Sequence, residues 1–240
     1  MSDALVSRSP SPLPSQGMPE RGLRRLRPWG ERRIRRTWDV RDTGMHHVPA
    51  TGPVILACNH VGWLDGPLMI GCAPRPAHAL VKHEAFVGRT GALLRFVGQI
   101  PVRREARDVG ALRRASSALL AGQCVVVYPE GIRGDGEVRR IKDGVAWLAL
   151  VSGAPVVPVA LFGTRAPGAG AETKPARGAR VDIVYGEPFR VDAAPWPRPR
   201  AHVADVAAQI HAHLRGHVAW AAETRGLSLP GPLPEEDDDE

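Results

Sequence analysis

Residues 58–66, CNHVGWLDG, place a histidine and an aspartate five positions apart, directly after the apolar run VILA. An imidazole can take up a proton and return it near neutral pH. A carboxylate bonded to one ring nitrogen would fix the tautomer and stabilise the imidazolium formed during a reaction. His60 and Asp65 are therefore candidates for a general base and its orienting acid. The alternative is a polar loop in which Asp65 caps the following helix.

This pair would act on an alcohol that the substrate supplies. The segment from His60 to Asp65 contains no serine or cysteine that could serve as a nucleophile, and such a dyad needs none. Cys58, at the end of the apolar run, is interpreted as a core residue.

A second polar group, YPEGIRG (128–134), follows the apolar run CVVV. Loops at the carboxyl ends of strands in α/β folds are where ligands bind. Gly131 permits close approach of the backbone, and Arg133 can hold two oxygens of a phosphate. The alternative is a strand-ending turn with a surface ion pair between Glu130 and Arg133.

A third group, VGQIPVRR (97–104), ends in two arginines. Either Arg103 or Arg104 could supply a second phosphate contact. Taken alone, this is equally well a solvated arginine pair.

Short apolar runs separated by helical patterns predict the elements that position these groups. They indicate an α/β fold: a single domain with a mostly parallel or mixed sheet flanked by helices. The predicted strands are 54–58, 78–82, 99–102, 124–131, 154–161 and 180–188, the last with an alternating pattern. The predicted helices are 66–73, 86–98, 108–122, 143–153 and roughly 201–225.

One uncharged run, 144–164, is long enough to cross a bilayer. It contains Ser152-Gly153, Pro155 and Pro158, which favour a helix, a turn and a buried strand instead.

Charge and cysteine content restrict the classes of function. The net charge is +7, and without the acidic last six residues, EEDDDE, the remainder carries +13. Such a balance favours a polyanionic partner, either nucleic acid or an anionic membrane surface. Three cysteines without CxxC or zinc spacing predict no disulfide framework and no structural zinc, in a reducing compartment. The first 20 residues lack the apolar core of a signal peptide.

The two ends of the chain differ from its centre in composition. Residues 1–20 are rich in Ser and Pro and are predicted to be disordered, as is the Pro-rich, then acidic, tail 227–240. In residues 21–38 eight arginines alternate with apolar residues, and Pro28 and Gly30 are expected to interrupt any single helix. The basic segment 21–40 is interpreted as membrane-docking, with arginines on phosphates and tryptophans at headgroup depth. A solvated basic arm, or one that binds nucleic acid, is the alternative.

In this order, the three polar groups resemble the glycerolipid acyltransferase family, which transfers fatty acyl chains to lysophosphatidic acid or glycerol 3-phosphate. The resemblance runs from about residue 40 to 190, and the predicted acyltransferase domain spans residues 41–226. Its motifs are matched by Asn59, His60 and Asp65; by Gly98, Ile100 and Arg104; by Tyr128-Pro129-Glu130-Gly131-Ile132-Arg133; and by VVPVA with Pro158. Two residues depart from the pattern: Ile132 replaces the usual threonine, and Arg103 stands where an acidic or small polar residue is common.

The resemblance implies a glycerol-3-phosphate acyltransferase-like fold and an acyl transfer to the free hydroxyl of a lysophospholipid, giving phosphatidic acid from 1-acylglycerol 3-phosphate. His60 would deprotonate the hydroxyl, and Asp65 would hold His60. The acceptor would be bound by Asn59, Arg104, Glu130, Gly131 and Arg133. The acyl donor would be acyl-CoA or acyl carrier protein, with no metal and no further cofactor.

The implied partners are the lysophospholipid, the acyl donor and an anionic membrane surface, without nucleic acid. The implied location is the cytoplasm, peripheral on the inner face of the cell membrane. The departures leave room for a different acceptor headgroup, or for a non-catalytic lipid-binding module of the same fold. A non-enzymatic polyanion-binding protein would leave His60, Asp65 and YPEGIRG unexplained as a set, and no groove-reading motif is present.

Overall fold

The computed structural model describes residues 16–103 and 108–234, in which one seven-stranded sheet forms the centre of the molecule. The strand order is β1-β7-β6-β2-β5-β3-β4. The strands are β1 (Asp39–Thr43), β2 (Val54–Cys58), β3 (Ala77–Lys82), β4 (Ile100–Val102), β5 (Cys124–Val127), β6 (Val156–Phe162) and β7 (Arg180–Tyr185).

The five strands β6, β2, β5, β3 and β4 are neighbours and all run parallel. Their carboxyl ends therefore share one edge of the sheet, where an α/β fold binds its ligands. Strand β7 is antiparallel to β6 and carries β1 beside it in parallel. The prediction of a mostly parallel or mixed sheet flanked by helices is confirmed.

Three strands differ from the prediction. Strand β5 ends at Val127 and not at 131, because residues 128–131 form a turn closed by a hydrogen bond from Gly131 N to the Tyr128 carbonyl. The sequence DVRDT of β1 carries too few apolar residues to predict a strand, and this edge strand pairs with β7 alone. Strand β7 does not alternate: every residue from Val181 to Tyr185 is buried. The reason is that both faces of β7 point into a core: Val184 belongs to the larger cluster, and Val181, Ile183 and Tyr185 belong to the second one.

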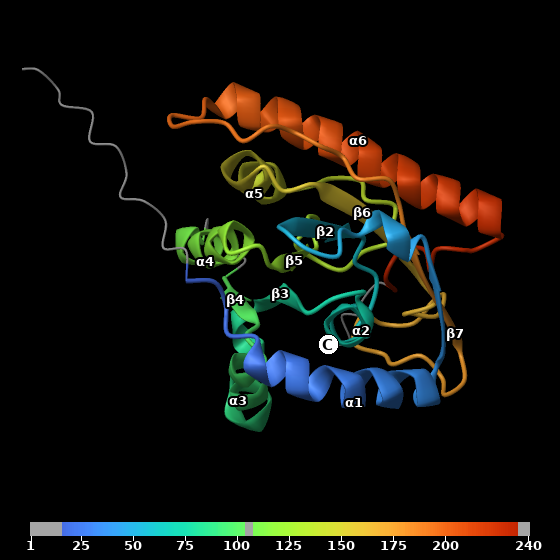
Figure 1. Cartoon of the computed structure of the whole chain (residues 1–240). Coiled ribbons are helices and arrows are strands. Elements are labelled where there is room, and N and C mark those ends of the chain that lie inside the picture. Colours follow the sequence, from blue (N-terminus) through green and yellow to red (C-terminus); the bar gives the residue numbers. More distant parts are fainter. Residues whose placement is uncertain (1–15, 104–107, 235–240) are drawn as a thin grey trace, which may run out of the picture.

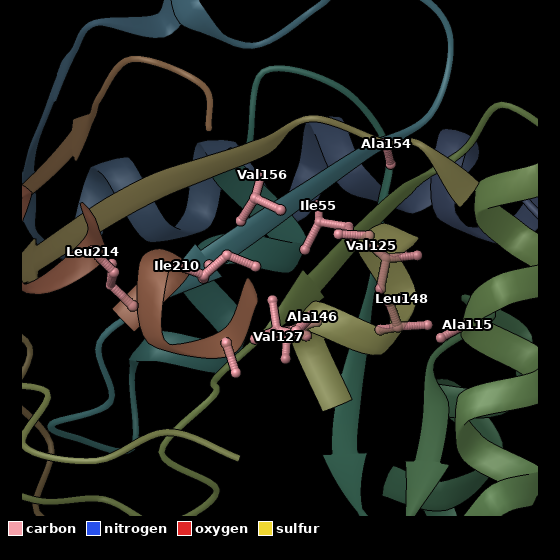
Figure 2. Packing of buried hydrophobic residues seen from close by; sticks show 14 of the residues in the cluster. Ile55, Ala115, Val125, Val127, Ala146, Leu148, Ala154, Val156, Ile210 and Leu214 are labelled. Atoms are coloured by element: carbon pink, nitrogen blue, oxygen red, sulfur yellow. The ribbon is translucent and has the colours of Figure 1, made fainter. Parts of the chain in front are cut away.

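Helices flank the sheet on both sides (Figure 1). On one side lie α4 (Val109–Leu120), α5 (Gly144–Ser152) and α6 (Arg200–Arg225), and on the other α1 (Arg21–Thr37), α2 (Asp65–Cys72) and α3 (Gly88–Phe96). The larger core joins α4, α5 and α6 to the sheet. Figure 2 shows Leu148 of α5 beside Val125, with Ile210 and Leu214 of α6 farther along the same cluster. A second core lies under α1 and α2.

The prediction that residues 21–38 cannot form a single helix is wrong. Helix α1 continues through both Pro28 and Gly30. Tertiary contacts outweigh the local cost, because Leu23 and Ile34 are buried and Arg27 donates a hydrogen bond to the carbonyl of Ala73 at the end of α2. The prolyl ring lies on the exposed side of the helix, where water can satisfy the carbonyl that loses its N–H donor.

The chain ends are held more closely than their composition predicts. Residues 1–20 are predicted to be disordered, and residues 1–15 of this segment lie outside the described residues. Within the rest of it, Met18 exchanges two hydrogen bonds with the Gln123 side chain, at 2.7 and 2.8 Å. The predicted tail begins at residue 227, yet the carbonyls of Gly231 and Pro232 accept hydrogen bonds from Arg165. Residues 227–234 therefore pack on the domain, and residues 235–240 lie outside the described residues.

The uncharged run 144–164 forms α5 and β6 with a turn between them, as predicted. Among the described helices, none combines the length and the apolar character needed to cross a membrane.

Candidate active site

His60 and Asp65 lie at the carboxyl end of β2 and contact each other directly. His60 Nδ1 is 2.7 Å from Asp65 Oδ2. An ionised carboxylate only accepts hydrogen bonds, so a neutral imidazole paired with it carries its proton on Nδ1 and its lone pair on Nε2. The imidazole side chain is 18% exposed while Asp65 is fully buried. The dyad thus has a buried acid and a partly accessible base.

The Asp65 carboxylate is fixed by the backbone of its own loop. Oδ2 also accepts hydrogen bonds from Val61 N at 2.7 Å and Gly62 N at 2.9 Å. Asp65 is the first residue of α2, but its side chain points back into the loop and does not cap that helix, so the capping alternative is excluded. Gly62 is required here, because a Cβ would come 2.6 Å from the carbonyl oxygen of Thr164.

Glu130 connects the loop after β5 to the histidine loop. His60 N donates to Glu130 Oε1 at 2.9 Å, and Gly134 N donates to the His60 carbonyl at 2.9 Å. Burial raises the pKa of Glu130 to about 7, with the negative charges of Asp135 and Asp65 acting in the same direction. The two predicted motifs are therefore one hydrogen-bonded unit around His60.

Tyr128 and Gly131 shape the turn that carries Glu130. The Tyr128 ring stacks on the His60 imidazole, with centroids 4.3 Å apart and planes 27° apart. Gly131 has a φ of +77°, and a Cβ there would lie 2.7 Å from Lys142 Cε. Both the positive φ and the close approach explain a glycine at this position.

Arg133 does not pair with Glu130. Its Nη1 donates to Glu172 Oε1 at 2.5 Å, and the same oxygen lies 3.3 Å from Lys82 Nζ. The alternative of a surface ion pair between Glu130 and Arg133 is thus wrong, because the two side chains leave the turn in different directions. Arg133 Nε is buried and has no hydrogen-bond partner within the described part of the chain.

Other predicted binding residues fall elsewhere. Asn59 is fully buried, and its amide both accepts from Leu161 N and donates to Leu161 O. This geometry favours a part in joining β2 to β6 over the predicted substrate contact. Arg104 lies outside the described residues. Its neighbour Arg103 lines a cavity of about 340 Å³ together with His83, Pro101, Asp108, Gly110 and Arg114.

Sequence reasoning missed Arg165, in the loop after β6. Arg165 is 2% exposed, and within the described part of the chain its guanidinium donates five hydrogen bonds, all to backbone carbonyls. The acceptors include Val61 beside the histidine, Gly134 in the loop after β5, and Gly231 in the C-terminal segment. The available signal was its place directly after a parallel strand, the rule that had singled out YPEGIRG.

The three cysteines Cys58, Cys72 and Cys124 are buried free thiols. The interpretation of Cys58 as a core residue is confirmed, since it is fully buried in the cluster under α2. Burial raises the pKa of its thiol far above the ordinary value, which keeps it protonated and unreactive. Within residues 16–103 and 108–234 no set of His, Cys, Asp and Glu side chains is grouped to hold a metal ion.

Comparison with known proteins gives a consistent result. The family model described as Acyltransferase matches residues 39–162. A 1-acyl-sn-glycerol-3-phosphate acyltransferase of Bacillus subtilis is 30% identical over 145 residues, which cover 60% of this chain and 70% of that protein. A lyso-ornithine lipid O-acyltransferase of Pseudomonas aeruginosa is 31% identical over 111 residues, covering 45% of this chain and 43% of that protein.

The fold also has a counterpart among solved structures. The 1-acyl-sn-glycerophosphate (LPA) acyltransferase PlsC from Thermotoga maritima superposes with a TM-score of 0.58 at 24% sequence identity, covering 80% of this chain and 79% of that one. The matched family model contains β2 and β5 with the polar loops that follow them. On these matches the chain belongs to the acyltransferase family and is an acyltransferase that resembles the 1-acylglycerol-3-phosphate O-acyltransferases.

Proposed function

We propose that this acyltransferase moves a fatty acyl group from acyl-CoA or acyl carrier protein to the free hydroxyl of 1-acylglycerol 3-phosphate, giving phosphatidic acid. The observation that carries the proposal is the 2.7 Å contact between His60 Nδ1 and the buried Asp65 carboxylate. It leaves a basic Nε2 on a partly exposed ring, which an alcohol acceptor needs and a mere binding module does not.

The proposed reaction takes place in two stages around His60. Nε2 takes the proton from the acceptor hydroxyl while its oxygen attacks the thioester carbonyl, and Asp65 stabilises the imidazolium that forms. The C–S bond then breaks, and the imidazolium returns the proton to the departing thiolate. The products are an oxygen ester and a free thiol, so atoms and charge balance without a further reactant.

Arg133 is the proposed ligand for the acceptor's phosphate among the described residues. Its Nε is buried and has no hydrogen-bond partner among the described residues, and Arg133 follows the strand next to β2. A guanidinium binds two phosphate oxygens at once. Arg104, Glu130 and Gly131 remain the other predicted acceptor-binding residues, with Glu130 placed to hold the His60 loop.

Because the lysophospholipid acceptor resides in a bilayer, we propose that the enzyme acts peripherally on an anionic membrane surface, on the cytoplasmic face. Helix α1 presents exposed arginines and Trp29, which is 70% exposed. Arginines bind anionic headgroups and tryptophan prefers the interfacial depth of a bilayer.

The test is acyl transfer from an acyl thioester to lysophosphatidic acid by the wild type and by His60→Ala. We expect kcat to fall about 10²- to 10⁴-fold in the variant, the usual contribution of a positioned base. Cys58→Ala, which removes a nearby thiol that plays no part, is the matched control. Turnover by His60→Ala close to that of the wild type would contradict the proposal.

A further inference from the structure

Arg133 and Lys82 share an acidic partner, Glu172. Lys82 is the last residue of β3, and Arg133 follows the adjacent parallel strand β5. Glu172 lies in the segment between β6 and β7, far from both in sequence. Its Oε1 is 2.5 Å from Arg133 Nη1 and 3.3 Å from Lys82 Nζ. One carboxylate oxygen thus joins two cations at the ligand-binding edge of the sheet.

The fold holds Glu172 at this position from both sides. Before it, Arg165 is buried at the start of the segment. After it, Lys174 Nζ lies 4.6 Å from the centroid of the Trp63 ring, and Trp38 Nε1 donates to the Pro175 carbonyl at 3.2 Å. Trp63 belongs to the loop between His60 and Asp65. The segment between β6 and β7 therefore contacts the histidine loop through Lys174 and places Glu172 against Arg133.

The two sides of the Glu172 contact differ in burial. The Arg133 side chain is 19% exposed, whereas Glu172 is 62% exposed. The hydrogen bond from Arg133 is the main cause of a lowered pKa for Glu172, so the group is a carboxylate at neutral pH. Exposed ion pairs are weak and exchange readily with a competing anion. A mostly buried guanidinium paired with an exposed carboxylate is therefore a cation site from which a competing anion can displace that carboxylate.

We propose that Glu172 is a specificity-determining residue: its carboxylate occupies the Arg133 and Lys82 cations, and the acceptor's anionic headgroup must displace it. The inference rests on the proposed function, in which Arg133 binds the acceptor's phosphate. A phosphate monoester carries close to two negative charges and three acceptor oxygens at neutral pH, so it competes well against one carboxylate. A headgroup without net negative charge does not, and the site selects phosphomonoesters.

The test measures binding of glycerol 3-phosphate, which carries the headgroup without an acyl chain, by titration calorimetry. Glu172→Gln keeps the size of the side chain and removes its charge. We expect its Kd to fall about 1.5- to fivefold relative to the wild type, the range expected on removing one weak competing ion pair. In acyl transfer the same variant should lower the KM for lysophosphatidic acid by a similar factor.

Two further variants separate this effect from general electrostatics. Glu187→Gln makes the same change of net charge at a side chain that is 78% exposed and lies beside His47. It should leave the Kd unchanged. In an Arg133→Gln background, Glu172→Gln should tighten binding less than it does in the wild type, because only the Lys82 cation is left for Glu172 to occupy.

An unchanged or weaker Kd in Glu172→Gln would overturn the inference, as would equal tightening in Glu187→Gln. A variant that instead loses transfer to a lysolipid with a cationic headgroup would overturn it too, since Glu172 would then bind the headgroup directly. Binding does not require turnover. A protein that transfers no acyl group to lysophosphatidic acid, yet binds glycerol 3-phosphate more tightly in Glu172→Gln, would refute the proposed function and support the anion site.

Discussion

At the scale of single residues, the candidate site separates into a proton-transfer pair and the groups that hold it. Asp65 Oδ2 accepts three hydrogen bonds, from His60 Nδ1 and from the backbone of Val61 and Gly62. Glu130 accepts a fourth bond from the backbone of His60 itself. The spacing of His60 and Asp65 predicts the pair, because both lie in one short loop. The contact of Glu130 with that loop joins residues 70 positions apart, and no local pattern reveals it.

Glu130 makes the stability of the protein depend on pH. Its pKa is about 7 in the folded protein, against an ordinary value of 4.5. Between these values the unfolded chain releases the proton and the folded chain retains it, so the free energy of unfolding falls as pH rises from about 4.5 to 7. Below pH 4.5 Glu130 is protonated in both states, and its burial costs no stability through ionisation. Above pH 7 Glu130 is ionised in both states, and the full cost of holding its charge in a buried place lowers the free energy of unfolding.

We expect Glu130→Gln to stabilise the protein relative to the wild type at pH 8 and to lose that advantage at pH 4.5. At pH 8 the free energy of unfolding of Glu130→Gln should exceed that of the wild type by about 2 kcal/mol. This is less than the full free-energy equivalent of the Glu130 pKa shift, because solvent screens the partly exposed carboxyl. Urea unfolding of both proteins at several pH values measures it. Glu137→Gln in the same loop, half exposed, is the control that should show no such dependence. A constant difference between Glu130→Gln and the wild type across pH would contradict the assignment.

At the scale of elements, the sequence predicts the strands and helices that are set by apolar periodicity and by Gly or Pro at their ends. It misses the elements that form because of tertiary contacts. Strands β2, β3 and β6 and helices α4 and α5 lie close to their predicted places, because their apolar runs are bounded by Gly or Pro. Strand β5 begins at the predicted residue and ends four residues earlier. Helix α1 was missed because a proline and a glycine count against a helix locally, whereas buried Leu23 and Ile34 are visible only in the fold. The C-terminal segment from residue 227 was mispredicted for the same reason. Its composition predicts disorder, whereas hydrogen bonds from Arg165 to the carbonyls of Gly231 and Pro232 hold it on the fold.

Arg165 connects three segments, and its loss should cost stability through all of them. Arg165→Met leaves five buried or partly buried carbonyl contacts without their donor, and we expect a loss of about 3 kcal/mol in the free energy of unfolding. Deleting residues 229–240 removes two of the same contacts. The deletion should therefore cost less in the Arg165→Met background than in the wild type.

Urea unfolding of the four proteins in this cycle measures the coupling. Arg177→Met, an exposed arginine in the same segment between β6 and β7, is the matched control and should change stability by less than about 0.5 kcal/mol. Fully additive costs for Arg165→Met and the deletion would show that the arginine does not hold the C-terminal segment.

At the scale of the whole molecule, α1 brings the uneven charge of the chain onto one surface. Exposed Arg25, Trp29, Arg32 and Arg36 recur at helical spacing, so they share one side of the helix, while Leu23 and Ile34 face the core. Helix α1 therefore belongs to the folded body as well as to the proposed membrane surface. Removing residues 1–38 would take Leu23 and Ile34 out of the fold, so point variants on the exposed side test the surface more cleanly.

We expect sedimentation with anionic vesicles to decrease in Trp29→Ala and more strongly in the combined Arg25→Gln, Arg32→Gln and Arg36→Gln variant. Each arginine near an anionic surface contributes about 1 kcal/mol, so the triple variant should bind at least tenfold more weakly, and added salt should weaken the wild type in the same way. Trp220→Ala is the matched control: this tryptophan is 51% exposed, but it lies on α6, across the sheet from α1 (Figure 1). If Trp220→Ala lowers vesicle binding as much as Trp29→Ala while the triple variant binds like the wild type, the membrane-facing surface lies elsewhere on the molecule.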